Sequence, residues 1–333
     1  MQFLREKEDP AQMAEDVRAG LLGNPKDLSP WPKYLYDKKG SELFEEITAL
    51  PEYYQTRTEL SILKEKAPEI VARTHCRELV ELGSGSASKT RTLLDAMMAT
   101  QASSVPGYGQ VRYVPLDVSE SALRGSTRSL LEEYSSSLEI SGFVGDFDRS
   151  LESLLARSRG AENPGRLIIF LGGTIGNFKP ERREEFLRRL RGGLGERDHV
   201  LIGVDLVKDA RILEAAYDDK AGITARFNKN LLNVLNRKLG GEFDPELFTH
   251  RAHYDAGAAR IEMWLDSKVR QKVAVAALGL EVSFEAGEGI RTEISHKFTL
   301  ESVADAFEEV DLRLLELYTD EENLFGLALG ATR

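Results

Sequence analysis

The residues between 80 and 90, VELGSGSASKT, could hold part of a nucleotide-like ligand. Gly83 and Gly85 permit a tight turn and let backbone amides approach a ligand, and Lys89 adds a positive charge. Three ligands use loops of this kind: a dinucleotide, a nucleoside triphosphate with magnesium, and S-adenosylmethionine. Ser88 stands where the dinucleotide loop has its third glycine and where the triphosphate loop has the glycine before its lysine. The triphosphate alternative stays open, because Asp205 ends an apolar run and could serve magnesium.

Polar residues that follow two later apolar runs favour S-adenosylmethionine. Asp117 ends the run YVPLD and could accept hydrogen bonds from ribose hydroxyls. Asp146 and Phe147 follow the next run, where a carboxylate can accept from the adenine amine and a phenyl ring can pack on the base. A helix-capping role for Asp117 before Ser119 is the alternative. Ligands of parallel sheets bind at the carboxyl ends of strands, which is where these side chains fall.

Two further groups of residues could bind a methyl acceptor. Asn177 closes the glycine-rich segment 170–178, and its amide can accept from an amine and donate to a carboxylate. Glu293 and Ser295 are two residues apart, so a strand would place both side chains on one face. A carboxylate and a hydroxyl can bind the two nitrogens of an imidazole. A loop-capping asparagine and an exposed polar strand face are the alternatives.

Alternating strands and helices must position these side chains. Strand-like runs alternate with segments of helical spacing through the middle of the chain, and a helix and a hairpin follow at its end. This alternation predicts an α/β fold with a parallel sheet. We expect a seven-stranded Rossmann-like methyltransferase sheet. Its predicted strands are 78–82, 111–116, 138–144, 166–171, 199–206, 312–318 and 324–329, and its predicted helices include 88–98, 119–133 and 300–309.

The chain divides into two predicted domains. The S-adenosylmethionine-binding domain comprises 57–213 and 296–333, and 1–56 with 214–295 form a smaller α+β substrate-binding domain. The smaller domain contains a helix at 11–22 and strands at 259–265 and 278–284, and it closes over the carboxyl edge of the sheet.

Composition narrows the class of protein. The 333 residues include 44 basic and 55 acidic side chains, a net charge of −11 that disfavours nucleic acid as a partner. The basic cluster within 182–191 is interleaved with glutamates and is expected to be a solvated helix face. No apolar run is long enough to span a membrane, and the first residues form no signal peptide. Cys76 is the only cysteine, which leaves no cysteine metal cluster. We therefore expect a cytoplasmic enzyme without a metal.

Long sequence words from about Pro30 onward resemble the L-histidine Nα-methyltransferases of ergothioneine biosynthesis. Fungal relatives and a tryptophan-methylating branch share parts of them. The words are GSELFEEIT at 40–48, PEYY at 51–54, LG with IGN at 171–177, DLVKD at 205–209, RIEMWL at 260–265 and TEIS with KF at 292–298. His296 and Gly173 depart from the family pattern, and the polar loop 101–110 is longer than usual.

The resemblance implies a function and a set of ligand contacts. It implies transfer of methyl groups from S-adenosylmethionine to the α-amino group of free L-histidine, three times, to give hercynine. Asn177 and Tyr36 would orient the amine without a dedicated base, and the enzyme would need no protein partner and could act as a monomer. The implied substrate-binding residues are Tyr53, Gly172, Asn177, Tyr217, Met263, Glu293 and Ser295, and the implied cofactor-binding residues are Gly83, Gly85, Lys89, Asp117, Asp146 and Phe147.

Three other functions remain open at this stage. One is a methyltransferase for another free amino acid such as tryptophan. The second is an ATPase that uses the phosphate-like loop around Lys89. The third is a protein that binds the cofactor without catalysis and acts as a scaffold.

Overall fold

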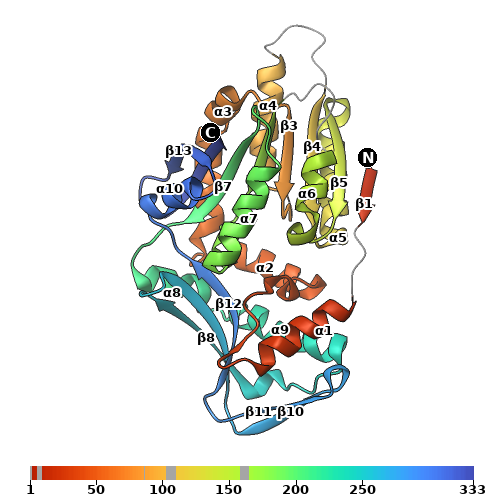
Figure 1. Ribbon diagram of the computed structural model, residues 1–333, viewed down its shortest axis with the longest axis vertical. Helices are drawn as coiled ribbons and strands as arrows, with labels where there is room; N and C mark the ends of the chain where they lie inside the picture. The colour runs from red at the N-terminus through yellow and green to blue at the C-terminus, as the bar shows by residue number, and fades with distance from the viewer. Residues whose placement is uncertain (1, 6–9, 86, 103–109, 158–164) are drawn as a thin grey trace.

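A computed structural model describes residues 2–5, 10–85, 87–102, 110–157 and 165–333 (Figure 1). Most of the loop predicted at 101–110 lies outside the described residues, which end at 102 and resume at 110. Among the described residues, no helix has the length and apolar character needed to cross a membrane.

The larger domain is built on an eight-stranded sheet in the order β1-β5-β4-β3-β6-β7-β14-β13. The first six strands run parallel, and β14 is antiparallel to both β7 and β13. All seven predicted strands are present, which confirms the Rossmann-like sheet, and β1 is an additional edge strand. The bounds are β1 Gln2–Arg5, β3 Glu78–Leu82, β4 Val111–Asp117, β5 Leu138–Val144, β6 Arg166–Phe170, β7 His199–Asp205, β13 Leu312–Thr319 and β14 Phe325–Thr332.

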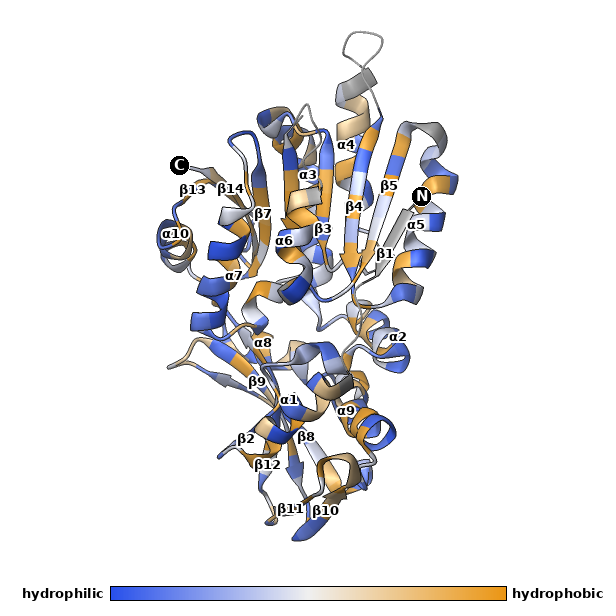
Figure 2. Cartoon of the chain, turned by 45° about the vertical axis from the view of Figure 1, so that its right-hand side comes forward, coloured by the Kyte–Doolittle hydropathy of each residue, from blue (hydrophilic) through white to orange (hydrophobic). Residues whose placement is uncertain are grey.

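Helices cover both faces of this sheet. Alternate strand residues bury on opposite faces: Leu167 and Ile169 of β6 pack in one hydrophobic cluster, and Ile168 and Phe170 pack in another. The strands are correspondingly hydrophobic over most of their length (Figure 2). The first cluster includes side chains of α3 (Tyr54–Thr74), α4 (Thr90–Ala102) and α5 (Glu120–Tyr134), and the second includes side chains of α6 (Phe147–Arg157), α7 (Pro180–Gly192) and α10 (Leu300–Glu308).

The smaller domain lies beyond the carboxyl ends of the parallel strands (Figure 1). It contains a four-stranded sheet in the order β2-β12-β9-β8, a β10–β11 hairpin and four helices around one hydrophobic cluster. Its strands are β2 Lys26–Asp27, β8 Phe248–Asp255, β9 Arg260–Ser267, β10 Gln271–Val275, β11 Leu280–Phe284 and β12 Gly289–His296. Its helices are α1 Pro10–Leu22, α2 Lys38–Thr48, α8 Ala210–Tyr217 and α9 Ile223–Leu239, with the 3-10 turns η1 Pro32–Leu35, η4 Pro245–Leu247 and η5 Ala276–Leu278.

Several features of the smaller domain differ from the sequence expectation, which did not include α2, α8, β2, β8 or β10. Helix α9 was not predicted, although Phe227, Leu231 and Leu235 recur at the four-residue spacing of a buried helix face. Strand β1 pairs in the larger sheet, whereas the range 1–56 was assigned to the smaller domain. The division into two domains otherwise stays a prediction, which the separate hydrophobic clusters support.

Strand β12 connects the two sheets. It pairs antiparallel with β9 in the smaller sheet, and its continuation forms a parallel bridge between Phe298 and Leu206 after β7. The Phe298 N–H donates to the Asp205 carbonyl at 2.8 Å, and the Val207 N–H donates to the Phe298 carbonyl at 2.9 Å. The end of β12 is therefore fixed to the carboxyl end of β7.

Candidate functional site

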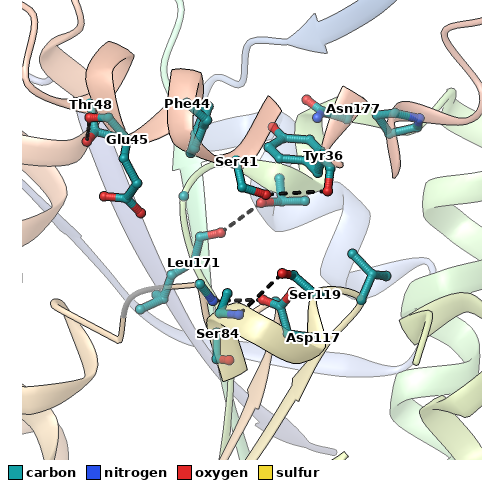
Figure 3. A pocket seen from close by; sticks show the side chains of 18 of the residues that line it. Tyr36, Ser41, Phe44, Glu45, Thr48, Ser84, Asp117, Ser119, Leu171 and Asn177 are labelled. Atoms are coloured by element: carbon teal, nitrogen blue, oxygen red, sulfur yellow. Dashed lines mark hydrogen bonds between the residues drawn. The ribbon is translucent and has the colours of Figure 1, made fainter. Parts of the chain in front are cut away.

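One cavity of about 800 Å³ lies between the two domains. It opens at the carboxyl ends of β3, β4, β6 and β7 and is closed by η1, α2, β9 and β12. Figure 3 shows side chains from both domains converging on it. The structure brings every predicted site residue to this cavity: Tyr36, Tyr53, Gly83, Gly85, Lys89, Asp117, Asp146, Phe147, Gly172, Asn177, Tyr217, Met263, Glu293 and Ser295 all line it.

The glycine loop after β3 is joined to the end of β4 through Asp117. Strands β3 and β4 run in register with Leu82 opposite Leu116, so the residues that follow them are neighbours. The Gly85 N–H donates to Asp117 Oδ2 at 2.8 Å, and the Ser119 N–H donates to Oδ1 at 2.8 Å. Gly85 has a φ of +49°, and a Cβ there would meet nothing within 4 Å, so conformation rather than space requires glycine.

The Asp117 carboxylate keeps capacity for a ligand. Burial raises its pKa, and its backbone hydrogen bonds oppose that shift. Each carboxylate oxygen accepts one backbone hydrogen bond and has a second lone pair left. Ser119, not Asp117, caps α5, because its hydroxyl accepts from the Ala122 N–H. Ribose hydroxyls are suitable donors for the remaining lone pairs.

The predicted adenine end is coupled to the smaller domain. Lys33, which lies in η1, forms an ion pair with Asp146 at 2.8 Å, a contact that sequence reasoning missed. Phe147 lines the cavity and packs edge-on against Phe170 and Phe178, with ring centroids 5.4 and 5.8 Å apart. This packing fixes the ring position, so a flat base could rest on it.

A buried glutamate links the cofactor loop to the acceptor loop. Glu59 of α3 is completely buried, forms an ion pair with Lys89, and accepts hydrogen bonds from the Gly172 N–H at 2.9 and 3.0 Å. Lys89 thus points to a protein carboxylate, not to a phosphate. Sequence reasoning missed Glu59, since nothing local distinguishes it from the other charged residues of α3.

Aromatic rings surround the acceptor end of the cavity. The Tyr36 ring lies 5.4 Å from Phe44 and 5.5 Å from Phe227, and the Tyr53 ring lies 6.1 Å from Phe44 and 6.3 Å from Tyr217. Burial raises the pKa of Tyr36 and Tyr53, so both hydroxyls keep their protons. Neither hydroxyl has a hydrogen-bond partner within the part of the chain that the structure describes. The rings could surround a substituted ammonium group, which is attracted to aromatic faces.

Asn177 is held against β12 by the close approach of Gly176. The residues Thr174–Asn177 form the turn η3, and a Cβ on Gly176 would lie 2.7 Å from the His296 carbonyl oxygen. Only glycine fits that contact without a shift of backbone. Asn177 and Tyr36 line the same cavity, and Figure 3 shows both side chains at its upper edge.

Strand β12 and its partner β9 form a buried wall of the cavity. Glu293, Ser295 and Met263 are all buried and line it, with Glu293 opposite Met263 in the strand register. Glu293 Oε2 has no hydrogen-bond partner among the described residues, and burial raises the pKa of this carboxyl to about 7. A buried carboxylate oxygen without a partner is costly, so it suits a ligand that brings an N–H. His296 is outside the lining, and burial lowers its pKa to about 4.

A buried charge network backs this wall. Asp205 at the end of β7 accepts from Lys297 Nζ at 2.8 Å and from Lys208 Nζ at 2.6 Å, and the Tyr54 hydroxyl also donates to it at 2.7 Å. The two lysines hold the pKa of Asp205 below its ordinary value despite burial. Because both oxygens of Asp205 are engaged by cations, the predicted alternative role as a magnesium ligand of a triphosphate site is wrong.

The described residues fit S-adenosylmethionine together with an amino acid. The glycine loop leaves open space, Asp117 keeps two free lone pairs, and the cavity continues from there to the aromatic rings and Glu293. An amine placed among the rings would lie between a cofactor site at β3 and β4 and a side-chain pocket at β9 and β12. The binding roles of the individual residues stay predictions.

The comparisons with known proteins give one consistent family. The model of a family described as histidine-specific, S-adenosylmethionine-dependent methyltransferases matches residues 13–332. The chain is 45% identical to a histidine N-alpha-methyltransferase of Mycolicibacterium smegmatis, over 96% of this chain and 94% of that one. It is 44% identical to the protein of the same name from Mycobacterium tuberculosis, over 97% of each chain. It is 31% identical to ergothioneine biosynthesis protein 1 of Schizosaccharomyces pombe, over 85% of this chain and 36% of that protein.

Proposed function

The chain belongs to the histidine-specific, S-adenosylmethionine-dependent methyltransferases, and we propose that it methylates the α-amino group of free L-histidine. The observation that carries this proposal is the buried pair Glu293 and Ser295 in the wall of a cavity that also reaches Asp117. An imidazole side chain supplies the N–H that the unpartnered Glu293 oxygen lacks.

The residues of this chain would act mainly by positioning. The sulfonium of S-adenosylmethionine supplies an activated methyl group, and Gly83, Gly85, Asp117, Asp146 and Phe147 would hold that cofactor. Fixing the amine in line with the methyl carbon converts a bimolecular reaction into a unimolecular one. The side chains nearest the amine would be Asn177 and Tyr36, which offer an amide and a protonated hydroxyl.

The amine must be neutral when it attacks. An α-amino group has a pKa of about 8 in peptides, so part of it is neutral near physiological pH. The amide oxygen of Asn177 can accept one amine proton and leave the lone pair directed at the methyl group, while water removes the proton that is lost. Tyr53, Tyr217, Gly172 and Met263 would hold the carboxylate and side chain of the amino acid.

We propose that three transfers occur and give the betaine hercynine. Each transfer adds a methyl group to the nitrogen, and the last transfer leaves a permanent cation. The rings of Tyr36, Phe44, Tyr53 and Phe227 lie where that cation would form, and cation–π attraction of about 0.5–2 kcal/mol favours it.

Mass spectrometry of products from a panel of free amino acids tests the proposal. With S-adenosylmethionine, histidine should give mono-, di- and trimethylated products, and phenylalanine and leucine should give almost none. Preferred turnover of tryptophan would support the alternative amino acid, and cofactor binding with no turnover of any amine would support the scaffold alternative.

We also propose that the enzyme acts as a monomer in the cytoplasm and needs no protein partner. The support is that the described residues of this chain supply groups for both ligands. Sedimentation of the active enzyme at assay concentration gives its molecular mass. The mass of one chain is expected, and the mass of a dimer would contradict the proposal.

A further inference from the structure

The hydroxyl of Ser295 is surrounded by two hydrogen-bond donors. Lys297 Nζ lies 2.8 Å from Ser295 Oγ, and the Tyr217 hydroxyl donates to the same oxygen at 2.9 Å. A serine hydroxyl has two lone pairs and one proton. Both lone pairs are therefore occupied by protein donors, and only the proton is left for a ligand in the cavity.

The direction of these bonds follows from the chemistry of Lys297. Its side chain is fully buried, and its ammonium has three N–H donors and no acceptor. Those donors meet Asp205 Oδ2 at 2.8 Å, Ser295 Oγ at 2.8 Å and the Tyr217 oxygen at 3.1 Å. Since the Tyr217 oxygen accepts from Lys297, its own proton is directed to Ser295, and burial raises the pKa of Tyr217 so that this proton is kept.

We propose that Lys297 is a positioning residue that makes Ser295 a hydrogen-bond donor, so that the cavity takes the histidine side chain only as a neutral imidazole in one tautomer. The inference rests on the proposed function. The ring nitrogen that faces Ser295 must offer a lone pair, and the ring N–H must go to Glu293. An imidazolium would direct a second N–H at an oxygen whose lone pairs are already used, which leaves a buried donor unsatisfied.

This arrangement also determines which nitrogen reacts. A neutral imidazole has one nitrogen with an available lone pair, and that nitrogen is itself a nucleophile. In the proposed complex the Ser295 proton binds this lone pair, and Glu293 binds the other nitrogen through its N–H. The α-amine is then the nitrogen of the substrate that keeps a free lone pair for the methyl group.

Several titratable groups surround the Ser295 hydroxyl. They come from β12 and its continuation, from the end of α8, from the end of β7 and from the start of α3: Glu293, Lys297, Tyr217, Asp205 and Tyr53, while His296 faces the other side of the strand. Only Glu293 titrates in the same range as an imidazole, with its pKa raised to about 7. A test by pH must therefore remove that titration.

The test measures the binding of hercynine, with S-adenosylhomocysteine present, by calorimetry between pH 5.0 and 7.5. Hercynine has a quaternary α-nitrogen, so the imidazole is its only group that titrates in this interval. The measurement uses Glu293→Gln, whose amide oxygen still accepts from the ring N–H and does not titrate. With an imidazole pKa of about 6.5, the neutral fraction falls about 30-fold from pH 7.5 to 5.0, and the dissociation constant should rise by that factor.

Adding Lys297→Met should flatten this dependence to less than about threefold, because the one Ser295 lone pair that it frees can accept from an imidazolium. Lys208→Met is the matched control: Lys208 is the other cation on Asp205, it does not contact Ser295, and its loss should leave the 30-fold dependence in place. A dependence that Lys297→Met leaves unchanged would overturn the inference.

Tyr217→Phe in the otherwise unaltered chain is a second test. It removes one donor to Ser295 without a change in charge. Glu293 titrates in both chains, so its contribution cancels in the comparison, and the variant should show a flatter pH dependence than the unaltered chain. The Tyr217→Phe variant tests the inference by itself in two cases. One is that Lys297→Met no longer binds S-adenosylhomocysteine and is therefore misfolded, and the other is that Glu293→Gln binds hercynine too weakly to measure. If the enzyme methylates histidine but Tyr217→Phe leaves the pH dependence of hercynine affinity unchanged, only the inference is overturned. If the unaltered chain neither methylates histidine nor binds hercynine, the proposed function is overturned.

Discussion

Replacing Glu293 with alanine should change the choice of amino acid more than it changes the chemistry of transfer. Its side chain is buried at 7% exposure, and Oε2 has no protein partner among the described residues, so the imidazole N–H would be its main hydrogen-bond donor. A hydrogen bond to a charged group contributes about 1.5–3 kcal/mol, which corresponds to a loss of about 10- to 150-fold in kcat/KM for histidine. An indole ring does not need that carboxylate, and its removal relieves an unpaired buried charge.

The assay is kcat/KM for histidine and for tryptophan, measured side by side for the unaltered enzyme and Glu293→Ala. The ratio of the two values should shift toward tryptophan by at least about tenfold. Glu281→Ala removes a carboxylate that pairs with Lys272 on the surface of the same domain, and it should alter neither value more than about twofold. Equal losses for both amino acids in Glu293→Ala would show that Glu293 is structural and that the imidazole binds elsewhere.

Four further outcomes follow from the site. Asp117→Ala should weaken S-adenosylhomocysteine binding by about 10- to 150-fold in calorimetry, and an unchanged dissociation constant would refute its role. Glu59→Gln should lower the free energy of unfolding by about 1–3 kcal/mol in urea titrations, because Lys89 and the Gly172 N–H lose a charged acceptor, and an unchanged value would exclude that linkage. ATP with magnesium should give no thermal shift, whereas S-adenosylhomocysteine should, and ATP hydrolysis lost on Lys89→Ala would contradict the site. Hercynine affinity should rise with pH through about 7 as Glu293, whose pKa is raised, loses its proton and becomes a stronger acceptor, and this part of the rise should be absent in Glu293→Gln.

The larger sheet could be predicted because its strands are continuous apolar runs with turn residues at their ends. Runs such as Arg166–Phe170 are buried on both faces, and that pattern is visible without a partner strand. Strand β14 was predicted for the same reason, whereas β13 is partly exposed and was predicted as the other strand of a hairpin with a polar turn at 319–323. Strand β1 was not, because its four residues pair only with a strand that lies more than 130 positions away in the chain.

The sequence predicted the site residues whose place follows from the end of a strand. It did not predict the residues that act through ion pairs and hydrogen bonds with distant parts of the chain. Asp117 follows a strand end, so its place at the cavity follows from the sheet alone. Glu59 meets Lys89 and Gly172 at separations of 30 and 113 residues, and Asp205 meets Lys297 at 92. Spacing in the sequence carries no information about such contacts. One signal for the network was available in the sequence. Lys297 is a charged residue directly after a strand, and such a residue needs a partner if it is buried.

The fixed junction of β12 with β7 has a consequence for processivity. The wall that would hold the imidazole is tied to the larger sheet by backbone hydrogen bonds and a buried ion pair. The turn η1 is tied to the larger domain by a contact that keeps some exposure, Lys33 with Asp146, whereas the residues just before it are fixed to β12 through β2.

A displacement of η1 alone would break an ion pair that water can replace, and it would leave β12 in place. Three successive transfers require the spent cofactor to be exchanged twice. We therefore infer that the cofactor could be exchanged while the amino acid stays bound to β12, so that partly methylated intermediates would not have to dissociate between rounds.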